Sequence, residues 1–401
     1  MKINYKLALL ILVDLVFLFY GVTTISISAK EAHIYYEGRG FLHQLVHLGT
    51  AVFGQNDFGL RIPFIIFHLL GVLLLYRVSG YYQKDENERV FTIALFMFLP
   101  GVLSSSLIVN SSSVTIFFTI FFIYLFEEQK KTRFHYILLF LLLFVDSSYE
   151  VLYLGVFAYA VFKRYKKLAI YTSILFLISL YIYGFDSGGK PKGYFLDTLA
   201  LYSLVFSPIL FLYYFYTMYR IVFKWQKTML WFISFTGFML SIVLSFRQRI
   251  PLSEFAPYAV IALPLVVDYF FRSVKVRLKI FRKPYYVALG VTVFFLIVNF
   301  SLTYFNKVLY LFLENPNKHF AQKFHIAKDL AKELKKQNID YISCDDKSMC
   351  LRLKFYKIHL GNQYLLSERK NSNNCKKVTI SYTNKPIKSY CVSNLHTFTL
   401  K

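Results

Sequence analysis

The sequence predicts an all-α polytopic membrane bundle of about eleven transmembrane helices, followed by a small C-terminal α/β domain. The composition is the first reason: of 401 residues, 56% are hydrophobic, 20% aromatic and only 17% charged, and the mean hydropathy is +0.47. A soluble domain carries about 25% charged residues. Apolar runs recur up to about residue 305, and polar sequence follows them.

Each apolar run is a candidate helical span of roughly 17–25 residues. The expected spans lie at about 7–26, 60–80, 91–109, 112–126, 135–146, 150–162, 168–184, 199–219, 228–246, 256–271 and 285–305. The first run is too long for the apolar part of a signal peptide, and "TTISISAK" leads directly into a charged loop. We therefore expect it to remain as a membrane anchor. Asp14 lies within it, and we expect this carboxylate to pair with a neighbouring helix.

The charges predict the topology. The net charge is +24, but the basic residues fall in every second loop, which a nucleic-acid-binding patch would not show. The basic loops are "MKINYK", "YYQKDENER", "EEQKKTRFH", "FKRYKK", "YRIVFKWQK" and "FRSVKVRLKIFRKP". Basic loops face the cytoplasm, so the N-terminus is predicted inside and, with an odd number of spans, the C-terminus outside.

The tail is predicted to form an extracytoplasmic α/β domain over residues 311–401, after a transmembrane domain over 1–310. "HFAQKFHIAKDLAKELKKQ" has the apolar spacing of an amphipathic helix. "IDYISC", "KVTISYT" and "HTFTL" are short runs typical of strands.

All four cysteines lie in this tail, which favours two disulfides in an oxidising compartment. We favour Cys344 with Cys350 and Cys375 with Cys391, one of three possible pairings. A four-thiolate zinc site is the alternative, and the absence of any CxxC pair makes it the weaker one.

The first outer loop holds the earliest dense polar cluster, in "SISAKEAHIYYEGRGFLHQLVHLGT". Glu31 follows the first span at the depth of the outer interface, where ionisable groups are usually functional. The segment from Ala32 to Gln55 has one apolar and one polar side and is predicted to be an interfacial helix. "FGQNDFGLRIP" then opens the second span.

These motifs resemble the C-type glycosyltransferase superfamily, in particular its bacterial protein O-mannosyltransferase-like and aminoarabinose-transferase-like branch. The resemblance rests on an acidic residue followed by Ala and aromatics after the first span, an interfacial segment, and "FG" with "LRIP" six residues later. "LPGVLSSSLIVNSSSVTIFFTIFFIYLF" is similar to the third and fourth spans of the family, and "FAPYAVIALPLVVDYFF" to its late proline-bearing span.

The resemblance implies an enzyme of the bacterial inner membrane, with its C-terminal domain in the periplasm. Members move a sugar from a polyprenyl-phosphate carrier to a lipid, glycan or protein acceptor on the outer face. The family usually has an Asp-Glu pair where this chain has Lys30-Glu31, and an acidic residue where it has Asn110. A catalytically altered or inactive scaffold is therefore the alternative function. A transporter is less favoured, because the spans carry few ionisable residues.

Sugar transfer requires a base for the acceptor proton and cations for the departing phosphate. Glu31 is the candidate base and Asn110 its neutral partner; the alternative is a solvated Glu31 paired with Lys30 or Arg39. Arginine grips phosphate with two parallel bonds. The candidate phosphate ligands are Arg247, Arg249, Lys190 and Lys192, with Arg61 matching a family arginine. If the assignment is right, the Glu31 carboxylate lies within roughly 15 Å of the Arg247 or Arg249 guanidinium.

The sequence predicts no definite cofactor and leaves a divalent metal open. His43 and His47 stand at i and i+4, a spacing that puts two ligands on one helix face, and His33 lies nearby. Glu37 is the nearest third ligand. Amphipathic histidines of an interfacial helix are the favoured interpretation.

Overall fold

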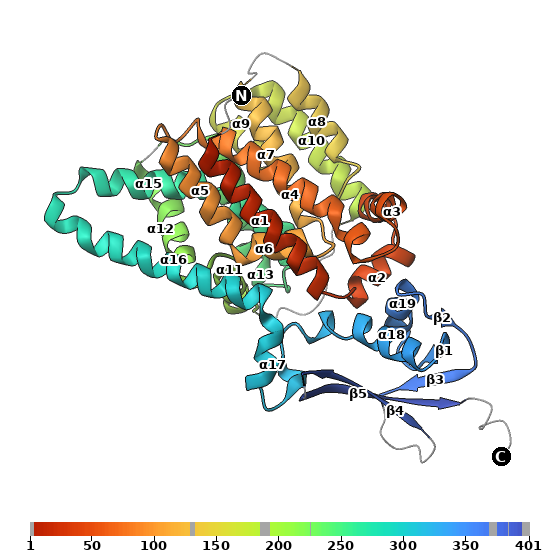
Figure 1. Cartoon of the computed structure of the whole chain (residues 1–401). Helices are drawn as coiled ribbons and strands as arrows, with labels where there is room; N and C mark the ends of the chain where they lie inside the picture. The colour runs from red at the N-terminus through yellow and green to blue at the C-terminus, as the bar shows by residue number, and fades with distance from the viewer. Residues whose placement is uncertain are drawn as a thin grey trace. The chain divides into compact units, whose positions relative to one another are not determined.

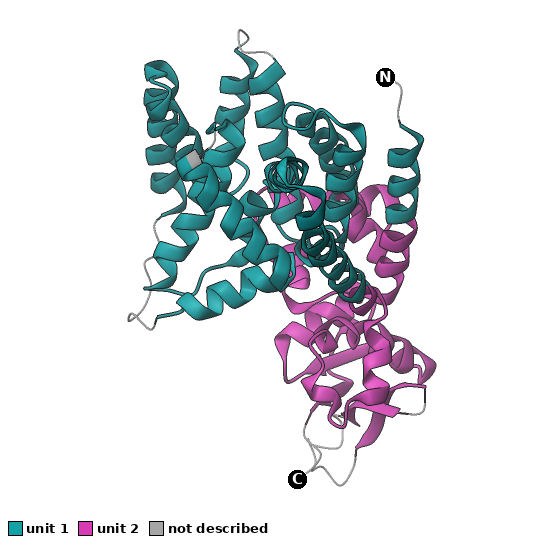
Figure 2. Ribbon diagram, turned by 90° about the vertical axis from the view of Figure 1, so that its left-hand side faces the viewer, with its two compact units in different colours: residues 1–15, 64–300 teal, residues 16–63, 301–401 magenta. Residues whose placement is uncertain are grey.

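The computed structural model describes residues 4–128, 133–184, 193–224, 226–368, 375–383 and 385–394. The chain forms two compact units, which Figure 2 colours separately. Residues 1–15 and 64–300 form the larger unit, and residues 16–63 and 301–401 the smaller. The sequence did not predict that the first outer loop belongs to the same unit as the C-terminal part.

Each predicted span of the larger unit contains one or two helices (Figure 1). Three long helices each contribute residues to both units: α1 (Tyr5–Thr24), α4 (Asp57–Ser79) and α16 (Lys283–Tyr304). The remaining helices of this unit are α5 (Glu86–Phe98), α6 (Pro100–Leu107), α7 (Ser112–Glu128), α8 (Phe134–Leu142), α9 (Tyr149–Phe162), α10 (Lys166–Tyr183), α11 (Phe195–Phe206), α12 (Pro208–Lys224), α13 (Met229–Ser245), α14 (Leu252–Val260) and α15 (Leu263–Val276).

Among the described residues, four helical segments are long and apolar enough to cross a membrane: Tyr5–Thr24, Asp57–Ser79, Lys166–Tyr183 and Lys279–Tyr304. Two bent helix pairs raise the number to six if each is one span. Such helices are typical of an integral membrane protein. The predicted total of eleven spans is not confirmed, because the other apolar helices are shorter.

Prolines interrupt two segments that the sequence analysis predicted as single spans. α11 and α12 meet at 107°, at Ser207, whose φ is 74°. α5 and α6 meet at 62°, at Leu99, which is extended. Pro208 and Pro100 follow these residues, and proline disfavours the helical conformation of the residue before it. The predicted spans 199–219 and 91–109 are therefore bent helix pairs, each a broken span or a re-entrant loop.

Asp14 pairs with a neighbouring helix, as predicted. Its Oδ2 lies 2.8 Å from Nε2 of His68 on α4, and both side chains are buried. The His68 ring also stacks on Phe96 of α5, at 6.3 Å between centroids. This contact satisfies one oxygen of a carboxylate that would otherwise be costly to bury.

The first outer loop forms two helices, so the predicted single helix from Ala32 to Gln55 was wrong. α2 (Ala29–Tyr36) and α3 (Phe41–Phe53) are separated at Gly38 and Gly40. Gly40 has a φ of +92°, which L side chains rarely adopt. A Cβ on Gly38 would lie 2.3 Å from the Ile34 carbonyl oxygen. The two glycines therefore permit a sharp turn that the apolar pattern alone does not reveal.

The C-terminal part of the smaller unit has helices packed against a five-stranded sheet (Figure 1). Its helices are α17 (Leu309–Phe312), α18 (Ala327–Lys336) and α19 (Lys347–Phe355), and its strands β1 (Tyr341–Cys344), β2 (His359–Leu360), β3 (Tyr364–Ser367), β4 (Lys376–Tyr382) and β5 (Lys385–Asn394). The sheet order is β2-β1-β3-β5-β4, with β1 parallel to both neighbours and the other pairs antiparallel. Leu330, Leu334, Ile342, Leu353 and Val378 contribute to the core.

The predicted elements of the tail are mostly present. "IDYISC" contains β1, and "KVTISYT" covers all of β4 except its first residue. The predicted amphipathic helix is shorter than expected, since α18 begins at Ala327 after a 3-10 turn over Gln322–Phe324. The predicted strand "HTFTL" lies outside the described residues.

Disulfides join Cys344 to Cys350 and Cys375 to Cys391, the favoured pairing. The first ties β1 to α19, and the second ties β5 to the residue before β4. We expect thiol labelling of denatured but unreduced protein to modify no cysteine, and labelling after reduction to modify four. Four labelled thiols without reduction would contradict the oxidised framework.

His325 makes the smaller unit sensitive to acid. Burial, with Lys307 and His319 nearby, lowers the pKa of His325 from 6.5 to about 3, and its Nδ1 lies 3.1 Å from the Tyr310 hydroxyl. Below pH 6.5 this histidine binds a proton in the unfolded chain but stays neutral in the folded protein. The free energy of unfolding therefore falls as the pH falls. A change from pH 7 to pH 5 should lower the free energy of unfolding by about 2 kcal/mol. Thermal unfolding of wild type and His325→Gln at both pH values measures this change, and the variant should lose less stability than wild type. Equal losses of stability would contradict the role of His325.

Candidate functional site

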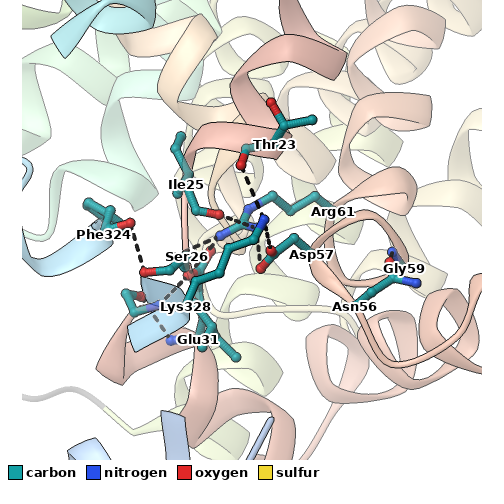
Figure 3. Close-up of polar contacts among 12 residues, drawn as sticks. Thr23, Ile25, Ser26, Glu31, Asn56, Asp57, Gly59, Arg61, Phe324 and Lys328 are labelled. Carbon is teal, nitrogen blue, oxygen red and sulfur yellow. Dashed lines mark hydrogen bonds and ion pairs between the residues drawn. The ribbon is translucent and has the colours of Figure 1, made fainter. Parts of the chain in front are cut away.

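Arg61 is the centre of the polar cluster in the smaller unit (Figure 3). Its side chain is completely buried and contacts two carboxylates: Nη2 lies 3.4 Å from Oε2 of Glu31, and Nη1 lies 3.4 Å from Oδ1 of Asp57. A buried guanidinium needs such partners, because an unpaired charge is strongly disfavoured away from water.

Main-chain carbonyls complete the surroundings of Arg61. Nη1 donates to the Ile25 carbonyl at 3.3 Å and Nη2 to the Ser26 carbonyl at 3.2 Å. Both residues belong to the segment between α1 and α2, which Figure 3 shows beside the guanidinium. The arginine therefore fixes the path of the chain that leads to Glu31.

Glu31 is held at the N-terminus of α2 by a capping box. The Ser28 amide donates to Glu31 Oε2 at 2.7 Å, and the Glu31 amide donates to Ser28 Oγ at 3.3 Å. This reciprocal pattern explains the helix start. Glu31 is 0% exposed, so the alternative of a solvated glutamate paired with Lys30 or Arg39 is wrong. Its cationic partner is Arg61, which is also one of the candidate phosphate ligands.

Asp57 is a second carboxylate that the sequence analysis missed. It lies in the first turn of α4 and is 5% exposed. Its Oδ1 accepts a bond from the Tyr356 hydroxyl at 2.6 Å, and its Oδ2 lies 2.8 Å from Nζ of Lys328. The sequence did contain a signal for the Arg61 contact, because Asp57 and Arg61 are spaced i, i+4 and share one helix face.

Three side chains of the C-terminal part contact main-chain groups at the end of α1 and in the segment that follows it. Lys328 Nζ donates to the Thr23 carbonyl at 3.2 Å, and Tyr356 accepts from the Ile27 amide at 2.9 Å. Arg352 Nε donates to the Ile27 carbonyl at 2.9 Å. Burial raises the pKa of Tyr356, and the Asp57 carboxylate adds to the effect. Tyr356 therefore keeps its proton and remains a donor to Asp57.

Asp57 also lines a cavity of about 350 Å³ within the smaller unit. Lys328, Lys335 and Lys357 bring three cations to its lining, and Gln55 and Asn56 bring amides. This mixture of cations and amides suits an anionic or strongly polar ligand.

Asn110 lines a different cavity, of about 190 Å³, in the larger unit. Its Oδ1 accepts from the Ser112 amide at 2.9 Å, and Ser112 Oγ donates to the Ser253 carbonyl at 2.9 Å. Ser104 and Ser105 add further hydroxyls to the lining. Amide and hydroxyl groups in this arrangement can hydrogen-bond a sugar.

Of the predicted phosphate ligands, Arg61 belongs to the same unit as Glu31, whereas Arg247 and Arg249 belong to the other unit. Arg247 and Arg249 are exposed residues of the larger unit, in the connection between α13 and α14. Arg249 lies three residues before Leu252, which lines the Asn110 cavity. Lys190 and Lys192 lie outside the described residues. The expected distance between Glu31 and the arginines stays a prediction.

The three histidines of the first outer loop have other partners. His43 Nδ1 and His47 Nε2 each lie 2.9 Å from a main-chain carbonyl, of Ile34 and Tyr35 respectively. His33 Nε2 lies 3.1 Å from Glu37 Oε2. In the part of the chain that the structure describes, no three His, Cys, Asp or Glu side chains cluster as metal ligands would.

Comparisons with known proteins agree with this architecture. A sequence model of the family described as dolichyl-phosphate-mannose-protein mannosyltransferase matches residues 41–184. No curated protein matches the sequence significantly.

Two crystal structures of ArnT from Cupriavidus metallidurans have a similar fold. The apo structure has a TM-score of 0.58 at 10% identity, covering 97% of this chain and 98% of that one. The structure bound to undecaprenyl phosphate has a TM-score of 0.58 at 9% identity, covering 96% and 97%. The chain therefore has an ArnT-like fold, and the two comparisons confirm the resemblance predicted from its sequence.

Proposed function

We propose that the chain is a membrane glycosyltransferase that takes a sugar from a polyprenyl-phosphate donor and transfers it on the outer face of the membrane. The acceptor is a hydroxyl of a lipid, a glycan or a protein. The family description over residues 41–184 supports this proposal, and so does the shared fold with ArnT, one of whose structures holds undecaprenyl phosphate.

The observation that carries the proposal is the buried Arg61 with its two carboxylates. Buried ion pairs contribute little net stability compared with apolar residues of the same size. A functional role therefore explains three buried charges better than stability does. The cluster also provides a second carboxylate, Asp57, where the family pattern of the sequence had left only Glu31.

Glu31 is the proposed base. The acceptor oxygen forms a bond to the anomeric carbon while the bond from that carbon to the phosphate oxygen breaks, and the acceptor proton passes to the Glu31 carboxylate. Asp57 is less suited to accept it, since its oxygens already contact Arg61, Lys328 and Tyr356. We assign Asp57 the positioning of Arg61 and Lys328.

Glu31 can accept a proton only if the acceptor reaches it. In this structure the carboxylate is buried, and the carbonyls of Ile25 and Ser26 lie against its partner Arg61. The proposal therefore requires the segment between α1 and α2 to open when substrates bind, as loops over active sites commonly do.

Arg247 and Arg249 are the proposed ligands of the donor phosphate, with Lys190 and Lys192 as further cations. Negative charge grows on the departing phosphate in the transition state, and a guanidinium stabilises it with paired hydrogen bonds. The hydroxyl-lined cavity beside Asn110 is the proposed sugar pocket.

An inactive scaffold with the same fold is the second candidate. Lys30 and Asn110, which replace acidic residues of the family pattern, favour it. A scaffold needs neither a donor lipid nor a base, so donor binding is the first property to measure.

Native mass spectrometry of the purified protein with undecaprenyl phosphate tests the donor assignment. We expect wild type to retain the lipid and Arg247→Gln/Arg249→Gln to retain at least about tenfold less, as for the loss of two cations near a phosphate. Arg133→Gln/Lys167→Gln, which removes two exposed cations at the starts of α8 and α10, serves as the matched control. Wild type that retains no undecaprenyl phosphate would overturn the proposed donor.

A further inference from the structure

The larger unit contains an apolar groove that the proposed reaction does not use. It lies between α5, α12, α15 and α16 and has a volume of about 170 Å³. Phe91, Leu95, Tyr213, Phe270, Tyr285 and Leu289 are among its lining residues. A dry cavity of about 150 Å³ holds a benzene molecule, so this groove has room for a segment of an acyl chain.

A strongly basic turn adjoins the groove. We use this name for residues 272–283, "RSVKVRLKIFRK", which contain six basic residues and no acidic one. The turn joins α15 to α16 at the tip of the hairpin that these helices form (Figure 1). Two of its cations are paired, Lys275 with Glu88 and Arg272 with Asp268. Among the described residues, Arg277, Lys279, Arg282 and Lys283 have no acidic partner.

Arg277 connects the basic turn to the groove. Its guanidinium carbon lies 4.3 Å from the centroid of the Tyr285 ring, and Tyr285 lines the groove. Arg282 fixes the turn by donating to the carbonyls of Arg277 at 2.8 Å and Lys275 at 3.0 Å. A cation is thus held at one end of an apolar groove, which is the arrangement of groups in a phospholipid site.

The turn also has the composition of a membrane interface. Val276, Leu278, Ile280 and Phe281 are exposed large apolar residues that alternate with its cations. The charge rule places this turn on the cytoplasmic side, whose lipid surface is anionic. Apolar side chains can enter the acyl region here while the cations remain among the headgroups.

From these observations we propose that the groove binds an anionic diacyl phospholipid of the cytoplasmic leaflet. One acyl chain lies along Phe91, Tyr285 and Leu289, and the headgroup phosphate contacts Arg277. Basic pockets between transmembrane helices on this side of a membrane commonly recognise anionic headgroups. The net charge of the turn selects an anionic headgroup over a zwitterionic one.

Native mass spectrometry of the purified full-length protein tests this site with phosphatidylglycerol and phosphatidylcholine of identical acyl chains. We expect wild type to retain about fivefold more phosphatidylglycerol than phosphatidylcholine, the factor for one cation near a phosphate. Arg277→Gln should lose this selectivity. Ala288→Phe, at an exposed position that lines the groove, should lose both lipids. The control Arg133→Gln, in another basic loop, should behave as wild type.

Three results would overturn the proposal. One is equal retention of the two phospholipids by wild type, and another is unchanged selectivity in Arg277→Gln together with unchanged retention in Ala288→Phe. The third is a preference for undecaprenyl phosphate that Arg277→Gln abolishes, because the groove would then belong to the carrier lipid.

Discussion

Replacing Arg61 by methionine should destabilise the smaller unit by about 3–5 kcal/mol. The substitution leaves Glu31 and Asp57 buried without the cation that lies 3.4 Å from each, and it frees the carbonyls of Ile25 and Ser26. At 2–4 °C per kcal/mol, the apparent melting temperature of the detergent-purified protein should fall by roughly 10 °C.

Two further variants separate the charge network from general effects at this loop. Arg39→Met removes an exposed arginine of the same loop and should change stability by less than about 0.5 kcal/mol. The stability of Arg61→Lys should fall between those of wild type and Arg61→Met, because one ammonium cannot contact two carboxylates as a guanidinium does. If Arg61→Met has the same melting temperature as wild type, the buried charge network does not stabilise this unit.

Replacing Glu31 by glutamine should lower the rate of sugar transfer by a factor of about 10²–10⁴, the usual contribution of a general base. Glutamine has nearly the same shape and can still accept from the Ser28 amide, so the start of α2 should be preserved. The rate is measured as transfer of labelled sugar in membranes that contain equal amounts of folded protein.

Glu37→Gln is the matched control, since Glu37 is a half-exposed glutamate directly after the last residue of α2. It should transfer sugar at the wild-type rate. Asp57→Asn should chiefly lower stability, because Arg61 and Lys328 then share less negative charge. If Asp57→Asn loses more activity than Glu31→Gln at equal stability, Asp57 is the base and Glu31 positions Arg61.

Local chemistry explains which parts of the fold the sequence predicted well. Hydropathy located the described helices of the larger unit, because a helix is rich in apolar side chains both where it faces lipid and where it packs inside the bundle, as α14 does. The breaks before Pro100 and Pro208 had a visible signal, "LPG" and "FSP", which the hydropathy pattern obscured. The cysteines predicted the disulfides because four of them fall within a short polar tail.

The contacts of Glu31 and Asp57 could be predicted from the sequence only in part. Glu31 was recognised from its place after the first span, but its burial depends on Arg61 and on carbonyls that carry no side-chain signal. Tyr356 reaches Asp57 across 299 residues of sequence, and no periodicity predicts such a contact. The spacing of Asp57 and Arg61 was the one available signal for the second carboxylate.

Mass spectrometry of surface glycans and polyprenyl-phosphate-linked sugars tests the proposed activity most directly. It compares cells that produce wild type, Glu31→Gln or no copy of the chain. We predict that cells with Glu31→Gln lose the same glycan as cells without the chain and accumulate the same polyprenyl-phosphate sugar, while wild type restores the glycan. Glycans and carrier-linked sugars that are identical in all three strains would contradict the assignment of this protein as a glycosyltransferase.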